Sequence, residues 1–218
     1  LARGPKNAAE QAQLDQLQEL VGPRQAEQQA NLFDRLRRSV AAGQKIFIFG
    51  ATRQYKEFCK FILEHSQGLR FKTGSLVVFG GGWKSFHGEQ ISREELLRLI
   101  TEAFGLPLDR ILEGYSMTEI NAFMLRCQAG RFHIPPTVEP VIFDAELAPV
   151  HGPELHGIFG FMDTLARAYP GFVISGDEVQ YLADGCPCGL AGPALTEVGR
   201  ARAREIKGCG GIMASLKA

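Results

Sequence analysis

The chain lacks a net charge, a long apolar run and a targeting leader. Lys and Arg together number 24, as do Asp and Glu, so no overall field would attract nucleic acid or an anionic membrane. No run approaches the roughly 18 apolar residues that a membrane-spanning helix needs. The chain opens on Leu1 with no basic-then-apolar leader, which favours a processed chain or a fragment. We therefore expect a cytoplasmic protein with no nucleic-acid partner and no membrane span.

Cysteines are few and odd in number. Five of them in a chain with no secretory leader argue against a disulfide framework and favour metal or thiol chemistry. The composition, 45% hydrophobic and 22% charged, is ordinary for a globular protein. With 218 residues, the chain can bury one sizeable core, or a core and a small appended lobe.

Residues 1–42 are polar and carry apolar residues at helical spacing. Phe33 and Leu36 belong to a repeat of three to four residues that follows Gly22-Pro23, and a similar repeat precedes it. Since Gly-Pro is a typical helix breaker, the pattern predicts two surface helices that cover a core.

Residues 43–130 alternate between strand and helix patterns. Ser92 is a predicted N-cap with Glu95 three residues later, and Gly105 closes that helix. Alternation at this spacing predicts βαβ units with a parallel sheet and right-handed crossovers. The predicted strands are 44–50, 75–83 and 110–116, and the predicted helices are 55–66 and 92–104.

Residues 131–218 have a different pattern. Short strand-like pieces such as "HGIFGFMD" and "GFVISGDEVQYL" are punctuated by Gly and Pro, which predicts a small, mainly antiparallel β lobe. The expected fold class is therefore α/β, with a parallel βαβ sheet lobe followed by this β lobe.

Two segments follow predicted parallel strands, where ligands bind in open α/β sheets. Gly80, Gly81 and Gly82 would let the backbone approach a ligand closely, although a structural turn explains a glycine cluster equally well. After the next strand, "GYSMTE" supplies a ring, a hydroxyl and a carboxylate. Such a set suits a nucleotide with its magnesium ion.

The order of five motifs, "GGGWK", "EGYSMTE", "SGDEV", "CPCG" and "VGR", resembles the second half of the adenylation domain of adenylate-forming enzymes. It is most similar to the branch of acyl-protein synthetases and phenylacetate–coenzyme A ligases, and the likeness covers roughly residues 40–210. The resemblance implies ATP and Mg²⁺ as cofactors. It also implies activation of a carboxylic acid by attack on the α-phosphate of ATP, with release of pyrophosphate.

The resemblance also implies roles for single residues. Tyr115 would pack on adenine, Thr118 would touch the α-phosphate and Glu119 would bind magnesium. Asp177 of "SGDE" would hold the ribose hydroxyls, and Arg200 of "VGR" would lie near ribose or phosphate. Without the resemblance, Asp177 is as readily explained as a turn residue of the β lobe.

A second group of residues has the donors of a metal site. Cys186 and Cys188 form a Cys-x-Cys pair, and Cys127 and His133 lie close together in the chain. Three thiolates and an imidazole suit a structural, tetrahedral Zn²⁺ with no open position for catalysis. Phenylacetate ligases resemble this arrangement. The alternative is a tight turn together with two unrelated residues.

Cys209 lies in "KGCGG", where the neighbouring lysine would favour the thiolate. In the acyl-protein synthetases, a cysteine near the C-terminus takes the acyl group from the adenylate, and Cys209 resembles it in position. An unreactive tail cysteine is the alternative. The implied partners are a carboxylic acid, most naturally a fatty acid, and a missing N-terminal half or an acyl-reductase partner.

Two family features are absent. The Ser/Thr/Gly-rich loop that grips the β- and γ-phosphates does not occur, so the chain alone should adenylate poorly. The C-terminal lobe whose lysine serves coenzyme A ligases is also missing, which favours an acyl-protein synthetase. The alternatives are a fragment of an aryl- or acyl-coenzyme A ligase, or a catalytically silent, zinc-stabilised binding module.

Overall fold

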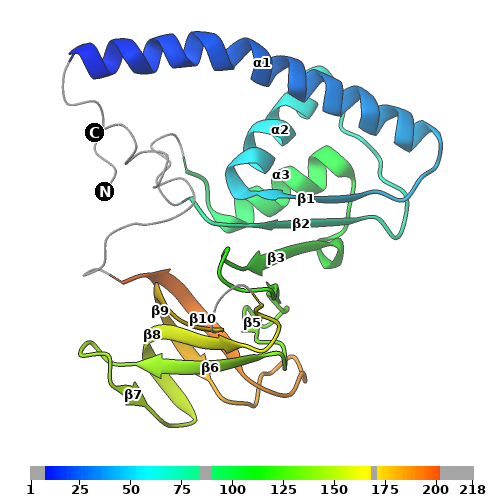
Figure 1. Cartoon of the computed structure of the whole chain (residues 1–218). Helices are drawn as coiled ribbons and strands as arrows, with labels where there is room; N and C mark the ends of the chain where they lie inside the picture. Colours follow the sequence, from blue (N-terminus) through cyan, green and yellow to red (C-terminus); the bar gives the residue numbers. More distant parts are fainter. Residues whose placement is uncertain (1–7, 84–89, 168–170, 202–218) are drawn as a thin grey trace. The chain divides into compact units, whose positions relative to one another are not determined.

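The structure is a computed structural model that describes residues 8–83, 90–167 and 171–201 (Figure 1). The chain forms two compact units, Leu1–Leu112 and Glu113–Ala218. The division lies after Leu112, whereas the sequence pattern placed the change of lobe near residue 130. No described helix combines the length with the apolar character that crossing a bilayer requires.

The N-terminal segment is a single helix, α1 (Ala8–Ala41), and the expectation of two helices is wrong. The helix continues through Gly22 and Pro23, although a proline inside a helix removes one backbone hydrogen bond. Phe33 of this helix is buried as predicted.

The first unit contains a pair of parallel strands, β1 (Phe47–Ala51) and β2 (Leu76–Gly80). Helix α2 (Thr52–His65) connects them, and α3 (Arg93–Phe104) follows β2 (Figure 1). The expected alternation of strand and helix is therefore confirmed.

The caps of α3 follow the local sequence. The Ser92 hydroxyl accepts a hydrogen bond from the Glu95 N–H at 3.1 Å. At the other end, Gly105 is left-handed with φ +64°, and its N–H donates to the Thr101 carbonyl at 2.8 Å. Both ends lie where the sequence predicted them.

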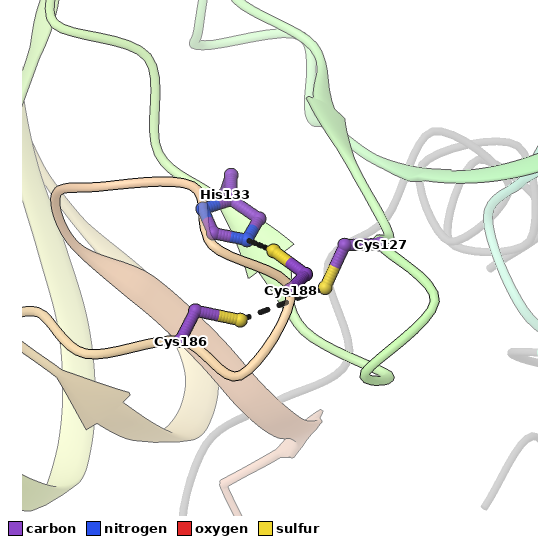
Figure 2. A group of neighbouring side chains, drawn as sticks. All are labelled: Cys127, His133, Cys186 and Cys188. Atoms are coloured by element: carbon purple, nitrogen blue, oxygen red, sulfur yellow. Dashed lines mark hydrogen bonds between the residues drawn. The ribbon is translucent and has the colours of Figure 1, made fainter.

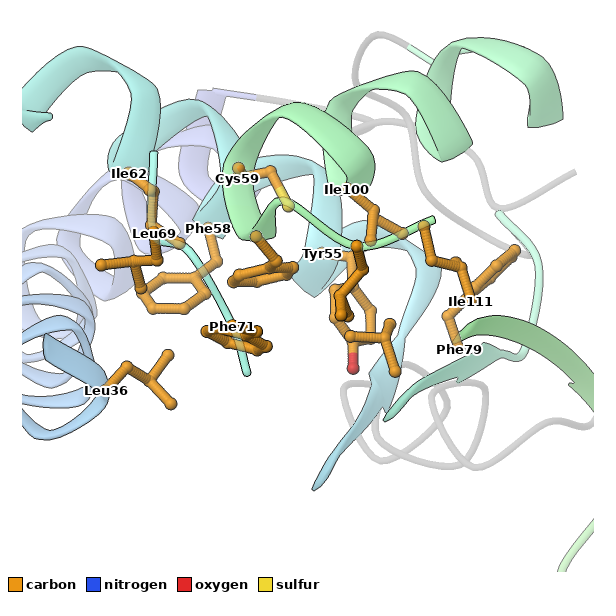
Figure 3. Packing of buried hydrophobic residues seen from close by; sticks show 14 of the residues in the cluster. Leu36, Tyr55, Phe58, Cys59, Ile62, Leu69, Phe71, Phe79, Ile100 and Ile111 are labelled. Carbon is orange, nitrogen blue, oxygen red and sulfur yellow. The ribbon is translucent and has the colours of Figure 1, made fainter. Parts of the chain in front are cut away.

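An aromatic core fills the space between the helices and one face of the parallel strands (Figure 3). Phe58 and Ile62 of α2 and Phe104 of α3 are buried in it, and so is Cys59. Successive side chains of a strand point to opposite faces of the sheet, and the core packs on one face of β1. On the opposite face, Phe47 and Phe49 are 65% and 61% exposed. The expectation that both faces of this strand are buried is therefore wrong.

The second unit is built on a six-stranded sheet with the order β5-β10-β9-β8-β6-β7. Every pairing in it is antiparallel, which confirms the predicted β lobe. Strand β3 (Ile111–Tyr115) enters this unit and pairs antiparallel with β4 (Met124–Leu125). The sheet strands are β5 (Phe132–His133), β6 (Val138–Phe143), β7 (Pro149–Val150), β8 (Glu154–Asp163), β9 (Phe172–Leu182) and β10 (Ala194–Arg200).

Candidate nucleotide and metal sites

The loop between β3 and β4 turns sharply because its start and end pack on each other. A Cβ at Gly114 would overlap the Phe123 ring as it now lies, so glycine lets these two residues pack closely. The Ser116 hydroxyl donates to the Ala122 carbonyl at 2.9 Å and closes the loop. The loop therefore presents the residues between these ends as one compact turn.

Tyr115, at the end of β3, meets two other residues that the sequence assigned to the nucleotide. Its hydroxyl donates to Asp177 Oδ2 at 2.7 Å, and Arg200 Nη1 lies 3.1 Å from Asp177 Oδ1. Asp177 and Arg200 are directly opposite each other on β9 and β10, which explains their contact. The structure thus brings together three predicted residues that are far apart in the sequence.

The surroundings keep the Tyr115 hydroxyl protonated. Burial raises the pKa of Tyr115 far above its ordinary value, and the neighbouring Asp177 carboxylate raises this pKa further. The phenol is therefore a hydrogen-bond donor to Asp177 rather than a source of charge.

Thr118 and Glu119 lie on the exposed side of the loop. The Thr118 hydroxyl donates to Glu119 Oε2 at 2.9 Å, so the hydroxyl and the carboxylate predicted for phosphate and magnesium are adjacent. Gly80, Gly81 and Gly82 belong to the first unit. Gly81 and Gly82 have φ values of +86° and +52°, and a Cβ on either would meet no described atom within 4 Å.

The sequence reasoning missed one residue that holds this loop. Asp163, at the end of β8, is 4% exposed, and its Oδ2 accepts from the Asn121 backbone N–H at 2.6 Å and from Asn121 Nδ2 at 2.8 Å. The hydrogen bond from the Asn121 backbone is the main reason that the pKa of Asp163 lies below its ordinary value. A carboxylate directly after the apolar run 158–162 of β8 was the one local signal of this role.

The four residues predicted as zinc ligands converge in the second unit (Figure 2). Cys127 Sγ lies 3.7 Å from Cys186 Sγ, and Cys188 Sγ lies 3.3 Å from His133 Nε2. All four ligand atoms lie within 4.8 Å of one another. The alternative of a turn with two unrelated residues is inconsistent with this convergence.

Two tight turns present the cysteines. The Gly130 N–H donates to the Cys127 carbonyl at 2.9 Å, and the Gly189 N–H donates to the Cys186 carbonyl at 3.0 Å. Both glycines are left-handed, with φ values of +78° and +84°, a conformation that glycine adopts without strain. The glycine three residues after Cys127 and the one three residues after Cys186 therefore explain why these short segments form tight turns.

The spacing of the donor atoms fits a metal ion better than a disulfide. Two sulfurs bound to a tetrahedral zinc at about 2.3 Å each lie about 3.8 Å apart, close to the separation of Cys127 and Cys186. A disulfide needs sulfurs about 2.05 Å apart. Burial raises the pKa of Cys127, but hydrogen bonds, that of the Arg131 backbone foremost, lower it to about 6. The hydrogen bond from the Leu190 backbone lowers the pKa of Cys188, but burial and the two neighbouring cysteines outweigh it, so this pKa is raised instead. The donor spacing therefore fits a tetrahedral metal ion, and Cys127 is the thiol whose pKa favours the thiolate.

Cys209, the predicted acyl acceptor, lies outside the described residues.

The fold is shared with a solved ligase. An open conformation of a 2-hydroxyisobutyryl-CoA ligase, in complex with 2-HIB-AMP and CoA, superposes with a TM-score of 0.58 at 19% sequence identity. The match covers 79% of this chain and 36% of the ligase chain. The fold is therefore that of part of an adenylate-forming enzyme.

The family profile described as "Acyl-protein synthetase, LuxE" matches residues 24–216. The chain belongs to this family of acyl-protein synthetases. A long-chain-fatty-acid–luciferin-component ligase of Aliivibrio fischeri is 30% identical over 164 residues, covering 72% of this chain and 42% of the relative. The ligase of the same name from Vibrio harveyi is 26% identical over 171 residues, covering 77% and 44%. The chain thus spans less than half the length of these relatives.

Proposed function

We propose that this chain supplies the nucleotide-binding part of an enzyme that activates a long-chain fatty acid with ATP. The observation that carries the proposal is the contact of Tyr115, Asp177 and Arg200 in a member of the acyl-protein synthetases. In the reaction, a carboxylate oxygen of the acid attacks the α-phosphorus of ATP. The bond between the α-phosphorus and the bridging oxygen breaks, pyrophosphate leaves, and acyl-AMP forms.

Each residue has a role in positioning the nucleotide rather than in proton transfer. The Tyr115 ring would lie beside adenine, and Asp177 would accept hydrogen bonds from the ribose hydroxyls. A carboxylate has about four acceptor sites, so Asp177 can bind ribose while it keeps its contacts to Tyr115 and Arg200. Thr118 would contact the α-phosphate, and Glu119 would hold Mg²⁺, whose preferred ligands are oxygens. Catalysis would then rest on orientation and charge stabilisation.

The acyl group would pass to a protein thiol in a second step. The thiolate of Cys209 attacks the acyl carbon, AMP leaves, and a thioester forms. Denaturing mass spectrometry after incubation with ATP, Mg²⁺ and hexadecanoic acid tests this step. An acyl-sized mass gain that hydroxylamine removes and that Cys209→Ser abolishes supports it. A gain retained in Cys209→Ser moves the acceptor elsewhere.

Binding of AMP and Mg·ATP to this chain by calorimetry tests the nucleotide site directly. We expect Asp177→Asn to weaken AMP binding at least about tenfold, since a carboxylate hydrogen bond to ribose contributes on the order of 1.5–3 kcal/mol. Glu119→Gln should abolish the gain in ATP affinity that Mg²⁺ gives. Glu146→Gln, in an exposed turn of the same unit, is the matched control. Equal affinities in all variants, or no AMP binding by the wild type, would contradict the proposal.

We also propose that Cys127, His133, Cys186 and Cys188 bind a structural Zn²⁺. Four protein ligands leave no open coordination position, so the ion would stabilise the second unit rather than activate water. The convergence of the four ligand atoms supports this assignment.

A further inference from the structure

Asp163 ends strand β8, and its carboxylate accepts three hydrogen bonds from protein groups. Besides the two bonds from Asn121, Oδ1 accepts from the Leu165 N–H at 2.9 Å. The backbone N–H of Asp163 donates to the Gly171 carbonyl at 2.7 Å, which fixes the residue at the end of the strand. A buried carboxylate with three donors around it has little capacity left for a substrate or a metal ion.

Its partner, Asn121, lies two residues after Glu119. Asp163 holds both the backbone and the side chain of Asn121, so it restrains the position and the rotation of that residue. The Ile120 N–H, between Glu119 and Asn121, donates to the Met117 carbonyl at 3.2 Å and closes the turn that contains Thr118 and Glu119. A shift of Asn121 would therefore move Thr118 and Glu119.

We propose that Asp163 is a positioning residue that anchors Asn121 and thereby fixes Thr118 and Glu119 for the phosphates and the metal ion. The contact joins segments 42 residues apart in the sequence, and it connects the loop to the six-stranded sheet. The functional consequence rests on the proposed nucleotide site, whereas the anchoring itself does not. Charge-assisted hydrogen bonds to a buried carboxylate are among the stronger ones in proteins, which suits a fixed support.

The test uses Asp163→Asn, which keeps the size of the side chain but loses the charge and one acceptor. Asn121→Ala is the second variant, since it removes only one of the two bonds from Asn121 and leaves β8 intact. Asp144→Asn is the matched control, because Asp144 also accepts a backbone N–H, that of Ala148 at 2.8 Å, in a turn of the same unit.

Hydrogen exchange and nucleotide affinity are measured on each variant. In Asp163→Asn we expect the amides of residues 117–122 to exchange at least about tenfold faster, while those of β8 and β9 keep their protection. AMP affinity should stay within about twofold of the wild type, and the Mg²⁺-dependent gain in ATP affinity should be lost. Asn121→Ala should show the same changes to a smaller degree, and Asp144→Asn should show none.

Two results would overturn the inference. Unchanged exchange of residues 117–122 in both Asp163→Asn and Asn121→Ala would show that Asp163 does not anchor the loop. A parallel loss of AMP affinity and of the Mg²⁺ effect would show a general structural role instead of selective positioning. If the wild type bound no AMP, the proposed function would fail, and the exchange rates alone would still decide whether Asp163 anchors the loop.

Discussion

Asp177 is engaged on both carboxylate oxygens before any ligand is considered. Tyr115 donates to one oxygen, and Arg200 lies beside the other. The side chain of Asp177 is 14% exposed, so these contacts operate in a partly dry environment where they are stronger than in water. The orientation of the carboxylate is therefore set in advance by the protein.

Replacing Tyr115 with phenylalanine should separate the hydroxyl from the ring. Tyr115→Phe loses a hydrogen bond to a charged group, so we expect the free energy of unfolding to fall by about 1.5–3 kcal/mol. AMP affinity should fall less than about tenfold, because the ring that would face adenine remains. Denaturant unfolding and calorimetry measure the two effects. Tyr181→Phe, in the same sheet, is the control, since the Tyr181 hydroxyl has no hydrogen bond within the described residues.

The pKa of Asp163 gives a pH dependence of stability. Because its pKa is lower in the folded protein than in the unfolded chain, the carboxylate stabilises the fold fully above its ordinary pKa of about 4. This contribution should be lost as the pH falls from about 4 through the lowered folded-state pKa. The difference in unfolding free energy between the wild type and Asp163→Asn, measured from pH 7 downward, should therefore shrink in that range. A difference that stays constant with pH would disprove the assignment.

Sequence reasoning selected residues that belong to motifs and missed residues whose contacts depend on a distant partner. Tyr115 and Asp177 were assigned from short motifs, and the structure brings them into contact. Asp163 and Asn121 belong to no motif, and their hydrogen bonds depend on how β8 ends beside the loop. Sequence spacing does not encode that proximity.

At the level of helices and strands, local chemistry decided some boundaries and tertiary context decided others. The ends of α3 follow from Ser92 and Gly105. The capping hydrogen bond of each residue reaches no more than four residues along the chain, so the local sequence determines it. Helix α1, in contrast, continues through Gly22-Pro23, the pair that predicted a helix break. A proline inside a helix costs about 3 kcal/mol, and the other interactions of a long helix can offset that cost.

Gly68 offers a test of how closely the end of α3 packs. Its φ is +85°, and an added Cβ would lie 2.5 Å from the Glu102 carbonyl oxygen, a backbone atom that cannot move alone. Gly68→Ala should therefore cost more than the roughly 1–2 kcal/mol of placing alanine in a left-handed conformation. Urea unfolding measures the difference.

Gly43→Ala is the control for Gly68→Ala. Gly43 has φ +65°, and its added Cβ would meet no described atom within 4 Å, so this variant carries the backbone penalty without the clash. If the two variants were equally destabilised, the close approach of residue 68 to α3 would be wrong.

At the scale of the whole molecule, metal should distinguish the two compact units. All four proposed zinc ligands belong to the second unit. Cys188→Ser should lose about one equivalent of zinc and a large part of the stability of that unit, because binding of a structural metal contributes to folding. Elemental analysis and thermal unfolding, with and without a chelator, measure this.

Cys59→Ala provides the contrast for the zinc experiment. Cys59 is fully buried in the core of the first unit and is not part of the ligand cluster. Its replacement should lower stability through a small cavity while the zinc content stays the same. Wild-type protein purified without any bound metal would remove the zinc proposal.

The overall architecture was accessible from the sequence because strand and helix periods differ so clearly along the chain. The parallel pair and the antiparallel sheet both appeared where the patterns predicted them. The exposure of Phe47 and Phe49 was not accessible, since an apolar run looks the same whether one or both faces of a strand are covered.

The cysteine cluster also bears on how fast the second unit refolds. Cys127 and Cys186 are 59 residues apart, and β5 pairs with β10 across a similar separation, so the native contacts close a long stretch of chain. Pairings between such distant segments form slowly, because the entropy of loop closure is lost before the contacts compensate for it. A metal ion that gathers both turns early would shorten this search. Refolding from denaturant should then proceed faster when zinc is present from the first moment than when it is added after collapse.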